Sequence, residues 1–178
     1  MPIKMKTILI VRLSFLSILI IAAVYVFYNE VFKEQEVVAA KVGYTAPDFT
    51  LKHLDRIEQT LSDHGGKGIV LNFWATYCPP CEKEMPYLEN AYQKYKNQGV
   101  DILAVNVAEP TLLVNQYVTN KNLTFQILLD RDGVVAEQYQ VQNLPITFFI
   151  DSNGEIIDKV SGELTEAKLK KGIEMIQP

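Results

Sequence analysis

The chain is poor in cysteine, histidine and clustered positive charge. Its 178 residues include two cysteines and two histidines. Both cysteines lie within residues 78–81, so no structural disulfide can link distant parts of the chain. The longest basic run after residue 40 is Lys170-Lys171, and that part carries 13 basic against 18 acidic side chains. No nucleic-acid partner is therefore expected, because phosphate binding needs a cluster of positive charge.

Apolar residues are concentrated near the N-terminus. No charged residue occurs from Leu13 to Tyr28, and residues 8–11 extend this run across the single Arg12. The combined stretch reaches the roughly 20 residues that span a bilayer core. Lys4 and Lys6 precede the stretch and a net negative segment follows it, so the positive-inside tendency places the N-terminus in the cytoplasm. We therefore predict a transmembrane signal-anchor within residues 1–28.

Two other interpretations of this segment stay open. Val38-Ala39-Ala40 offers small residues for cleavage of a signal peptide, but that position lies about ten residues past the apolar run. A buried core helix is the other alternative, although the run lacks the polar face that such helices have. The mixed-charge residues 29–42 are interpreted as a tether, and residues 43–178 as a globular domain outside the cytoplasm.

The globular part alternates short apolar runs with helical patterns. Continuous apolar runs at 69–74 and 102–107 are typical of strands buried on both faces. An Asn-Gly pair, Asn153-Gly154, predicts a hairpin between two late strands. The full set of expected elements comprises a hairpin (49–52 and 57–60), strands (69–74, 102–107, 125–128, 147–150 and 155–160) and helices (80–97, 111–119, 133–139 and 165–176).

This order predicts an α/β fold with a central mixed sheet. Alternating strands and helices imply parallel pairing through right-handed crossovers, whereas the terminal hairpin must be antiparallel. Helices should therefore cover both faces of the sheet. The hairpin at 49–60 would be an N-terminal extension of this unit.

One motif carries the chemistry: Cys78-Pro79-Pro80-Cys81 follows a buried strand and opens a helix. This spacing places Cys81 about one helical turn after Cys78, close enough for a disulfide that can form and break. Unpaired N–H groups and the positive end of the helix dipole stabilise a thiolate at Cys78. Proline in the first turn costs no helical hydrogen bond. The motif predicts a redox-active pair and no cofactor or metal.

The neighbouring residues argue against three other uses of the motif. A zinc site would need two more ligands, and His53 and His64 lie well before the motif. Covalent haem attachment needs His directly after the second cysteine, where the chain has Glu82. A purely structural disulfide would close a loop of only two intervening residues and would constrain the unfolded chain little.

The residues around the motif resemble the ResA-type, TlpA-like, membrane-anchored thiol-disulfide oxidoreductases of the thioredoxin superfamily. The resemblance rests on Asn72–Pro86, Gly99–Val107 and Leu144–Ile150, and it extends over about residues 43–176. It implies a thioredoxin-like fold and a bacterial protein held in the cell membrane by a single span. It also implies reduction of the haem-binding cysteines of apocytochrome c, with electrons from a CcdA-type membrane donor.

The resemblance assigns roles to single residues. Cys78 corresponds to the attacking cysteine and Cys81 to the resolving one, while Pro145 corresponds to the family's cis-proline beside the disulfide. Glu84 corresponds to an acidic residue near the site, and its position three residues after Cys81 places it on the same helix face. There a carboxylate could exchange protons with the thiols and raise their pKa values. The alternative for Glu84 is a solvated first-turn carboxylate.

Three further residues are expected to contact substrate. Glu109 corresponds to an acidic residue beside the family's site, although it could equally be a loop residue that precedes a helix. Trp74 and Tyr77 are expected to shield the disulfide and offer apolar surface to a partner, and Trp74 could equally belong to the core.

Two departures from the patterns of related proteins bear on function. Asn72 stands where typical thioredoxins have a buried Asp, which leaves proton transfer to Glu84. Pro79-Pro80 replaces the Glu-Pro pair of ResA proteins, and this dipeptide tunes the reduction potential.

Alternatives for the function are a reductase for other envelope or spore-assembly proteins, a thiol peroxidase, and a binding module that only holds apocytochrome. The chain lacks the proline-threonine-x-x-cysteine arrangement that a thiol peroxidase of this fold requires.

Overall fold

The computed structural model describes residues 12, 15–27 and 40–178. The chain divides into two compact units, residues 1–37 and 38–178. In the first unit, residues 15–27 are helical with exposed side chains. Within the described residues, no helix is long and apolar enough to cross a membrane. The expected transmembrane helix is therefore not confirmed, and the rest of the predicted anchor and most of the tether lie outside the described residues.

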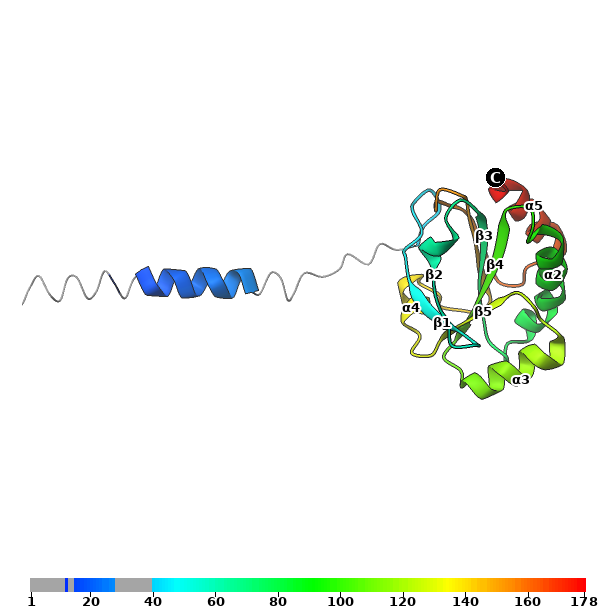
Figure 1. The fold of residues 1–178 in the computed structure, drawn as a ribbon, viewed down its shortest axis with the longest axis horizontal. Helices are drawn as coiled ribbons and strands as arrows, with labels where there is room; N and C mark the ends of the chain where they lie inside the picture. Colours follow the sequence, from blue (N-terminus) through cyan, green and yellow to red (C-terminus); the bar gives the residue numbers. More distant parts are fainter. Residues whose placement is uncertain (1–11, 13–14, 28–39) are drawn as a thin grey trace, which may run out of the picture. The chain divides into compact units, whose positions relative to one another are not determined.

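The second unit is built on one seven-stranded mixed sheet with the order β2-β1-β5-β4-β3-β6-β7 (Figure 1). The pairs β3·β4 and β4·β5 are parallel, whereas β1·β2, β1·β5, β3·β6 and β6·β7 are antiparallel. The predicted mixed sheet is thus confirmed. Its strands are β1 (Thr50–His53), β2 (Glu58–Thr60), β3 (Gly68–Trp74), β4 (Val100–Val107), β5 (Gln126–Asp130), β6 (Ile146–Ile150) and β7 (Ile156–Ser161).

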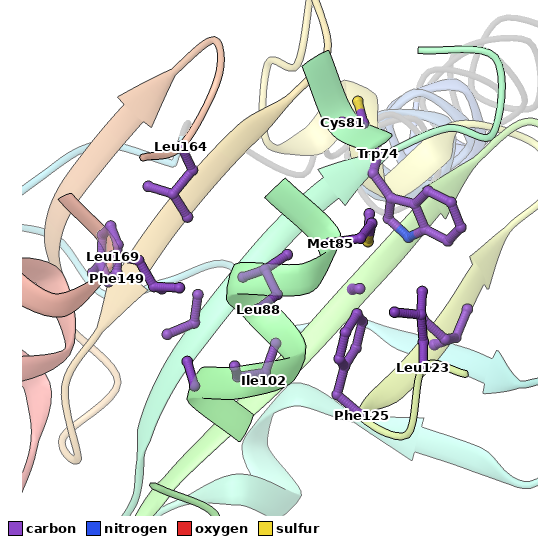
Figure 2. Close-up of a cluster of buried hydrophobic side chains, with 14 of the residues drawn as sticks. Trp74, Cys81, Met85, Leu88, Ile102, Leu123, Phe125, Phe149, Leu164 and Leu169 are labelled. Carbon is purple, nitrogen blue, oxygen red and sulfur yellow. The ribbon is translucent and has the colours of Figure 1, made fainter. Parts of the chain in front are cut away.

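Three helices cover one face of this sheet: α2 (Pro79–Tyr95), α3 (Thr111–Lys121) and α5 (Glu166–Ile176). Their apolar side chains pack with those of the central strands into a buried cluster that includes Trp74, Cys81 and Met85 (Figure 2). In α5, Gly172 meets the ring of Phe149, where an added Cβ would lie 2.1 Å from a ring carbon. This glycine allows the helix to lie directly on β6.

The opposite face is covered by α4 (Val134–Gln138), a short 3₁₀ helix, η1 (Leu61–His64), and the segment at 40–49. Tyr139 is the aromatic centre of this layer, with its ring 5.3 Å from that of Phe73 and 5.2 Å from that of Phe148. Its hydroxyl donates a hydrogen bond of 2.6 Å to the carbonyl of Pro47. This bond fastens the start of the domain to the sheet, and helices on both faces are confirmed.

Two features differ from the expected arrangement. The hairpin β1–β2 does not stand apart as an extension, because β1 pairs antiparallel with β5 and lengthens the sheet. In addition, η1 follows β2 directly, in a stretch for which the sequence predicted no element. Asp63 favours this 3₁₀ helix, because its carboxylate accepts a hydrogen bond from the N–H of Thr60 at 3.1 Å and caps the first turn.

Candidate active site

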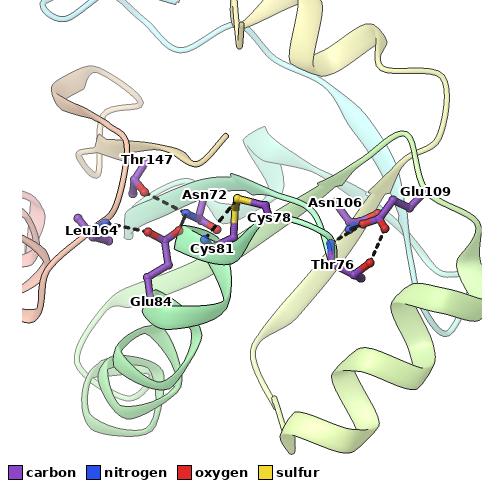
Figure 3. Close-up of a disulfide and its surroundings, with 9 residues drawn as sticks. All are labelled: Asn72, Thr76, Cys78, Cys81, Glu84, Asn106, Glu109, Thr147 and Leu164. Atoms are coloured by element: carbon purple, nitrogen blue, oxygen red, sulfur yellow. Dashed lines mark hydrogen bonds between the residues drawn. A yellow bond between two sulfur atoms is a disulfide. The ribbon is translucent and has the colours of Figure 1, made fainter. Parts of the chain in front are cut away.

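The two cysteines form a disulfide at the start of α2, and their Cα atoms are 5.2 Å apart (Figure 3). Strand β3 ends at Trp74, and four residues later Cys78 is the N-cap of the helix. Two prolines occupy the first turn, as predicted. The two cysteines differ in solvent exposure: Cys78 is 6% exposed and Cys81 is 0% exposed. An incoming thiolate can therefore reach only Cys78.

The N-terminus of α2 favours negative charge at Cys78. The backbone N–H of Cys81 donates to Cys78 Sγ at 3.3 Å. When the disulfide is reduced, this N–H and the positive end of the helix dipole stabilise a thiolate at the same atom. Cys78 is therefore the cysteine suited to attack a disulfide.

Glu84 lies one turn further along α2 and is completely buried. Its Oε1 accepts a hydrogen bond from Asn72 Nδ2 at 2.7 Å, and its Oε2 accepts one from the Leu164 N–H at 2.8 Å. Burial raises the pKa of Glu84 to about 7, since desolvation outweighs the two hydrogen bonds, which act in the opposite direction. Glu163 adds a smaller upward contribution through its negative charge. The alternative of a solvated carboxylate at this position is wrong.

Glu109 holds the loop that leads into Cys78. Its Oε2 accepts the backbone N–H of Thr76 at 2.6 Å and the side-chain Nδ2 of Asn106 at 2.7 Å. Its Oε1 accepts the Thr76 hydroxyl. Glu109 is 7% exposed, so it is a buried anchor for the loop. The carboxylate uses most of its capacity to accept hydrogen bonds within the protein, and a role for Glu109 in contacting substrate stays a prediction.

The Leu144-Pro145 peptide bond is cis, as the resemblance implied. Pro145 precedes β6, whose first residue, Ile146, pairs with Phe73 near the end of β3. This register brings Pro145 to the end of the sheet from which the cysteine loop departs. Its carbonyl accepts the N–H of Gly162 at 2.9 Å.

The two expected aromatic contacts have different outcomes. Trp74 is 0% exposed and packs against the Tyr117 ring with centroids 5.1 Å apart, so it belongs to the core and cannot offer surface to a partner. Tyr77, by contrast, is 72% exposed and directly precedes Cys78. A role for Tyr77 in contacting substrate stays a prediction.

Several polar residues of the site were not anticipated. Thr76 and Asn106 complete the Glu109 network, and Thr147 accepts a hydrogen bond from Asn72 at 3.0 Å. A signal existed for Asn106, because it interrupts an apolar strand. Across residues 12, 15–27 and 40–178, no group of three or more His, Cys, Asp or Glu side chains could hold a metal ion.

Known proteins share both the sequence and the fold of this chain. The AhpC/TSA family model matches residues 42–159. The thiol-disulfide oxidoreductase ResA of Geobacillus kaustophilus is 46% identical over 170 residues, covering 96% of this chain and 97% of the relative. ResA of Bacillus subtilis is 39% identical over 175 residues, covering 98% and 97%.

Solved structures agree with these relatives. StoA from Bacillus subtilis superposes with a TM-score of 0.63 at 27% identity, covering 71% of this chain and 96% of StoA. A secreted disulfide oxidoreductase of Mycobacterium tuberculosis, described as homologous to DsbE of E. coli, superposes with a TM-score of 0.65 at 25% identity, covering 71% and 95%.

Proposed function

The chain belongs to the AhpC/TSA family and, within it, to the ResA thiol-disulfide oxidoreductases, and from this premise we propose that it is a reductase of the haem-binding cysteines of apocytochrome c. Its redox centre is the Cys78–Cys81 pair, without a separate cofactor. The observation that supports reduction, rather than oxidation, of the substrate is the buried carboxyl group of Glu84. The ResA-like residues around the motif support the choice of substrate.

A negative charge beside the cysteines favours a reducing enzyme. Strongly oxidising relatives owe their potential to a stabilised reduced form, in which the attacking thiolate has a very low pKa. Here an ionised Glu84 one turn from Cys81 would destabilise a neighbouring thiolate and raise the thiol pKa values. The dithiol then gives up its electrons more readily.

The reaction proceeds through two exchanges at the same sulfur. The Cys78 thiolate attacks one sulfur of the substrate disulfide and forms a mixed disulfide, which releases the other substrate sulfur as a thiolate. Cys81 then loses its proton and attacks Cys78 Sγ, which releases the second substrate sulfur. Glu84, with a pKa of about 7, accepts the proton of Cys81 near neutral pH. A CcdA-type membrane donor returns two electrons to the Cys78–Cys81 disulfide.

We further propose that the catalytic domain is held outside the cytoplasm of a bacterium by an N-terminal anchor. The uncharged run from Leu13 to Tyr28 and the preceding basic residues support this location. The N-terminal mass of the membrane-bound protein tests it. An intact N-terminus in the membrane fraction is expected, and a mature protein that begins at Lys41 would refute the anchor.

Two peptide substrates test the proposed function. The reduced enzyme should react faster with a disulfide peptide that carries the CxxCH sequence of apocytochrome c than with insulin, and Cys78→Ala should abolish both reactions. Equal rates on both substrates would refute the cytochrome assignment and leave a general reductase. In cells, Cys78 and Cys81 should be mostly reduced and become oxidised when the CcdA-type donor is removed; oxidised thiols in both strains would contradict a reductase.

A further inference from the structure

Asn72 has an unused hydrogen-bond acceptor in the most enclosed part of the site. Its side chain is 0% exposed, and within the described part of the chain its Oδ1 has no hydrogen-bond partner. Both hydrogens of its Nδ2 are used, one by Glu84 Oε1 at 2.7 Å and one by Thr147 Oγ1 at 3.0 Å. A buried acceptor without a donor costs folding free energy, so the presence of one in the site calls for an explanation.

This acceptor lies on the strand face that the helix of the resolving cysteine covers. Asn72 lies between Val70 and Trp74 on the face of β3 that α2 covers, and both neighbours share a core cluster with Cys81. Cys81 and Glu84 are three residues apart on the helix face above it. In Figure 3 the Asn72 amide, hydrogen-bonded to Glu84, points toward Cys81 and the disulfide.

The oxidised and reduced proteins differ in what they can offer Asn72. In the disulfide, Cys81 Sγ carries no hydrogen, so it cannot donate. Reduction by two electrons and two protons breaks the sulfur–sulfur bond and gives Cys81 an S–H group, which is a weak donor. Because Cys81 is completely buried, this S–H has no access to water and needs an acceptor within the protein.

We propose that Asn72 is a positioning residue of the redox reaction, whose Oδ1 accepts the S–H of Cys81 in the reduced enzyme while its Nδ2 holds Glu84. The amide thus fixes the donor of the proton and its acceptor in one arrangement. During resolution, the Cys81 proton passes to Glu84, the Cys81 sulfur bonds to Cys78 Sγ, and the bond from Cys78 to the substrate sulfur breaks with its electron pair. This last step depends on the proposed role of Glu84, but the S–H bond to Asn72 does not.

The hydrogen bond also affects the redox equilibrium. In the disulfide form Asn72 Oδ1 is unpaired, and in the dithiol form it is paired, so Asn72 favours the reduced protein. Replacing Asn72 with Leu removes the unpaired acceptor from one form and the hydrogen bond from the other. Both changes act in the same direction, and the equilibrium with glutathione should shift toward the disulfide by about fivefold.

Infrared spectroscopy of the S–H stretch tests the bond directly. Cys78→Ser leaves Cys81 as the single thiol of the chain, so one S–H band reports on one residue. We expect this band to move to higher frequency in Asn72→Leu, because the hydrogen bond is lost. Asn106→Leu is the matched control: Asn106 is also buried, donates to Glu109 at 2.7 Å and has an unpaired Oδ1, yet its replacement should leave the band in place.

The remaining outcomes are also informative. A band that is unchanged in Asn72→Leu, or one that moves in Glu84→Gln but not in Asn72→Leu, would overturn the proposal. If Asn72→Leu does not fold, Asn72→Asp retains an oxygen acceptor of similar shape and should shift the band to still lower frequency; no shift would count against the proposal. None of these measurements needs a substrate, so a failure of the proposed reductase function would leave their result intact.

Discussion

Glu109 accepts hydrogen bonds from both the backbone N–H and the hydroxyl of Thr76, two residues before the attacking cysteine. A side chain two residues after β4 thereby fixes the loop that leaves β3. The attacking sulfur and its substrate must meet in a defined geometry, so this connection bears on reactivity as well as stability.

Glu109→Ala should therefore impair both properties. Removal of the carboxylate leaves the part-buried donors of Thr76 and the buried amide of Asn106 without their acceptor, which should lower the free energy of unfolding by about 3 kcal/mol. The loop before Cys78 loses its anchor, and kcat/KM for disulfide reduction should fall by at least about tenfold. Urea denaturation and steady-state kinetics measure these effects. Thr76→Ala keeps the backbone hydrogen bond and should be milder; equal effects of the two variants would contradict this account.

Glu84→Gln should change how stability depends on pH. The pKa of Glu84 is raised from 4.5 in the unfolded chain to about 7 in the folded protein. The stability that this group contributes is therefore fully present below pH 4.5 and is lost as pH rises through about 7. The loss is about 3 kcal/mol, and it should be absent from the Gln variant. Urea denaturation of both oxidised proteins between pH 4 and 8 would show this difference, whereas parallel curves would argue against a raised pKa.

The same substitution should alter the reactivity of the reduced enzyme. Without a carboxyl group near the cysteines, the pH profile of Cys78 alkylation should move to lower pH, because an ionised Glu84 raises the thiol pKa. The resolving step should slow by about 10- to 100-fold at pH 7, since its proton acceptor is gone. Superimposable alkylation profiles would remove Glu84 from the mechanism.

Much of the site could be predicted from local sequence. The position of the cysteine pair at a helix start follows from the strand before it and the prolines within it, and helical spacing places Glu84 on the face of Cys81. The burial of Glu84 could not be predicted this way. It depends on Asn72 and on the Leu164 N–H, which reaches the carboxylate from a loop 80 residues later in the chain.

The limits of sequence reasoning are also visible at Trp74 and in the hairpin. A tryptophan four residues before the first cysteine of the motif is compatible with either surface or core, and the packing of Trp74 against Tyr117 of α3 depends on the tertiary fold. The segments 49–52 and 57–60 predict the hairpin itself. Its pairing with β5 depends on which sheet edge is left free by the crossovers, and local patterns do not contain that information.

Asp101→Asn tests a buried polar group at the start of β4. The Asp101 Oδ2 accepts hydrogen bonds from His64 Nδ1 at 2.7 Å and from Lys67 Nζ at 2.9 Å, and the bond from His64 is the largest cause of its lowered pKa. A lowered folded-state pKa gives stability that is present above the unfolded value of 3.8 and is lost as pH falls through the folded value.

The Asn variant should accordingly be about 1–3 kcal/mol less stable than the parent at pH 7. This difference should shrink at about pH 3, and urea denaturation at the two pH values measures it. Lys67→Met is the control, because Lys67 is 48% exposed and its contact should contribute at most about 1 kcal/mol. A deficit of Asp101→Asn that is the same at both pH values would contradict the pKa argument.

Gly172→Ala tests the close contact between α5 and β6. The new Cβ would lie 2.1 Å from the Phe149 ring, so helix or ring must shift, and we expect a loss of about 3 kcal/mol in the free energy of unfolding. Lys171→Ala, one residue earlier on the exposed side of the helix, should change it by less than about 0.5 kcal/mol. Thermal denaturation compares the two variants, and similar midpoints would show that α5 does not pack tightly on the sheet.

The unequal burial of the two cysteines has a consequence for the order of events in the cell. Every partner, whether it delivers electrons or receives them, must approach the same sulfur, Cys78 Sγ, because Cys81 is closed off. An electron donor and a substrate consequently compete for one binding position and cannot bind at the same time. The domain must dissociate from one partner before it binds the other, so it carries electrons between them by alternate binding.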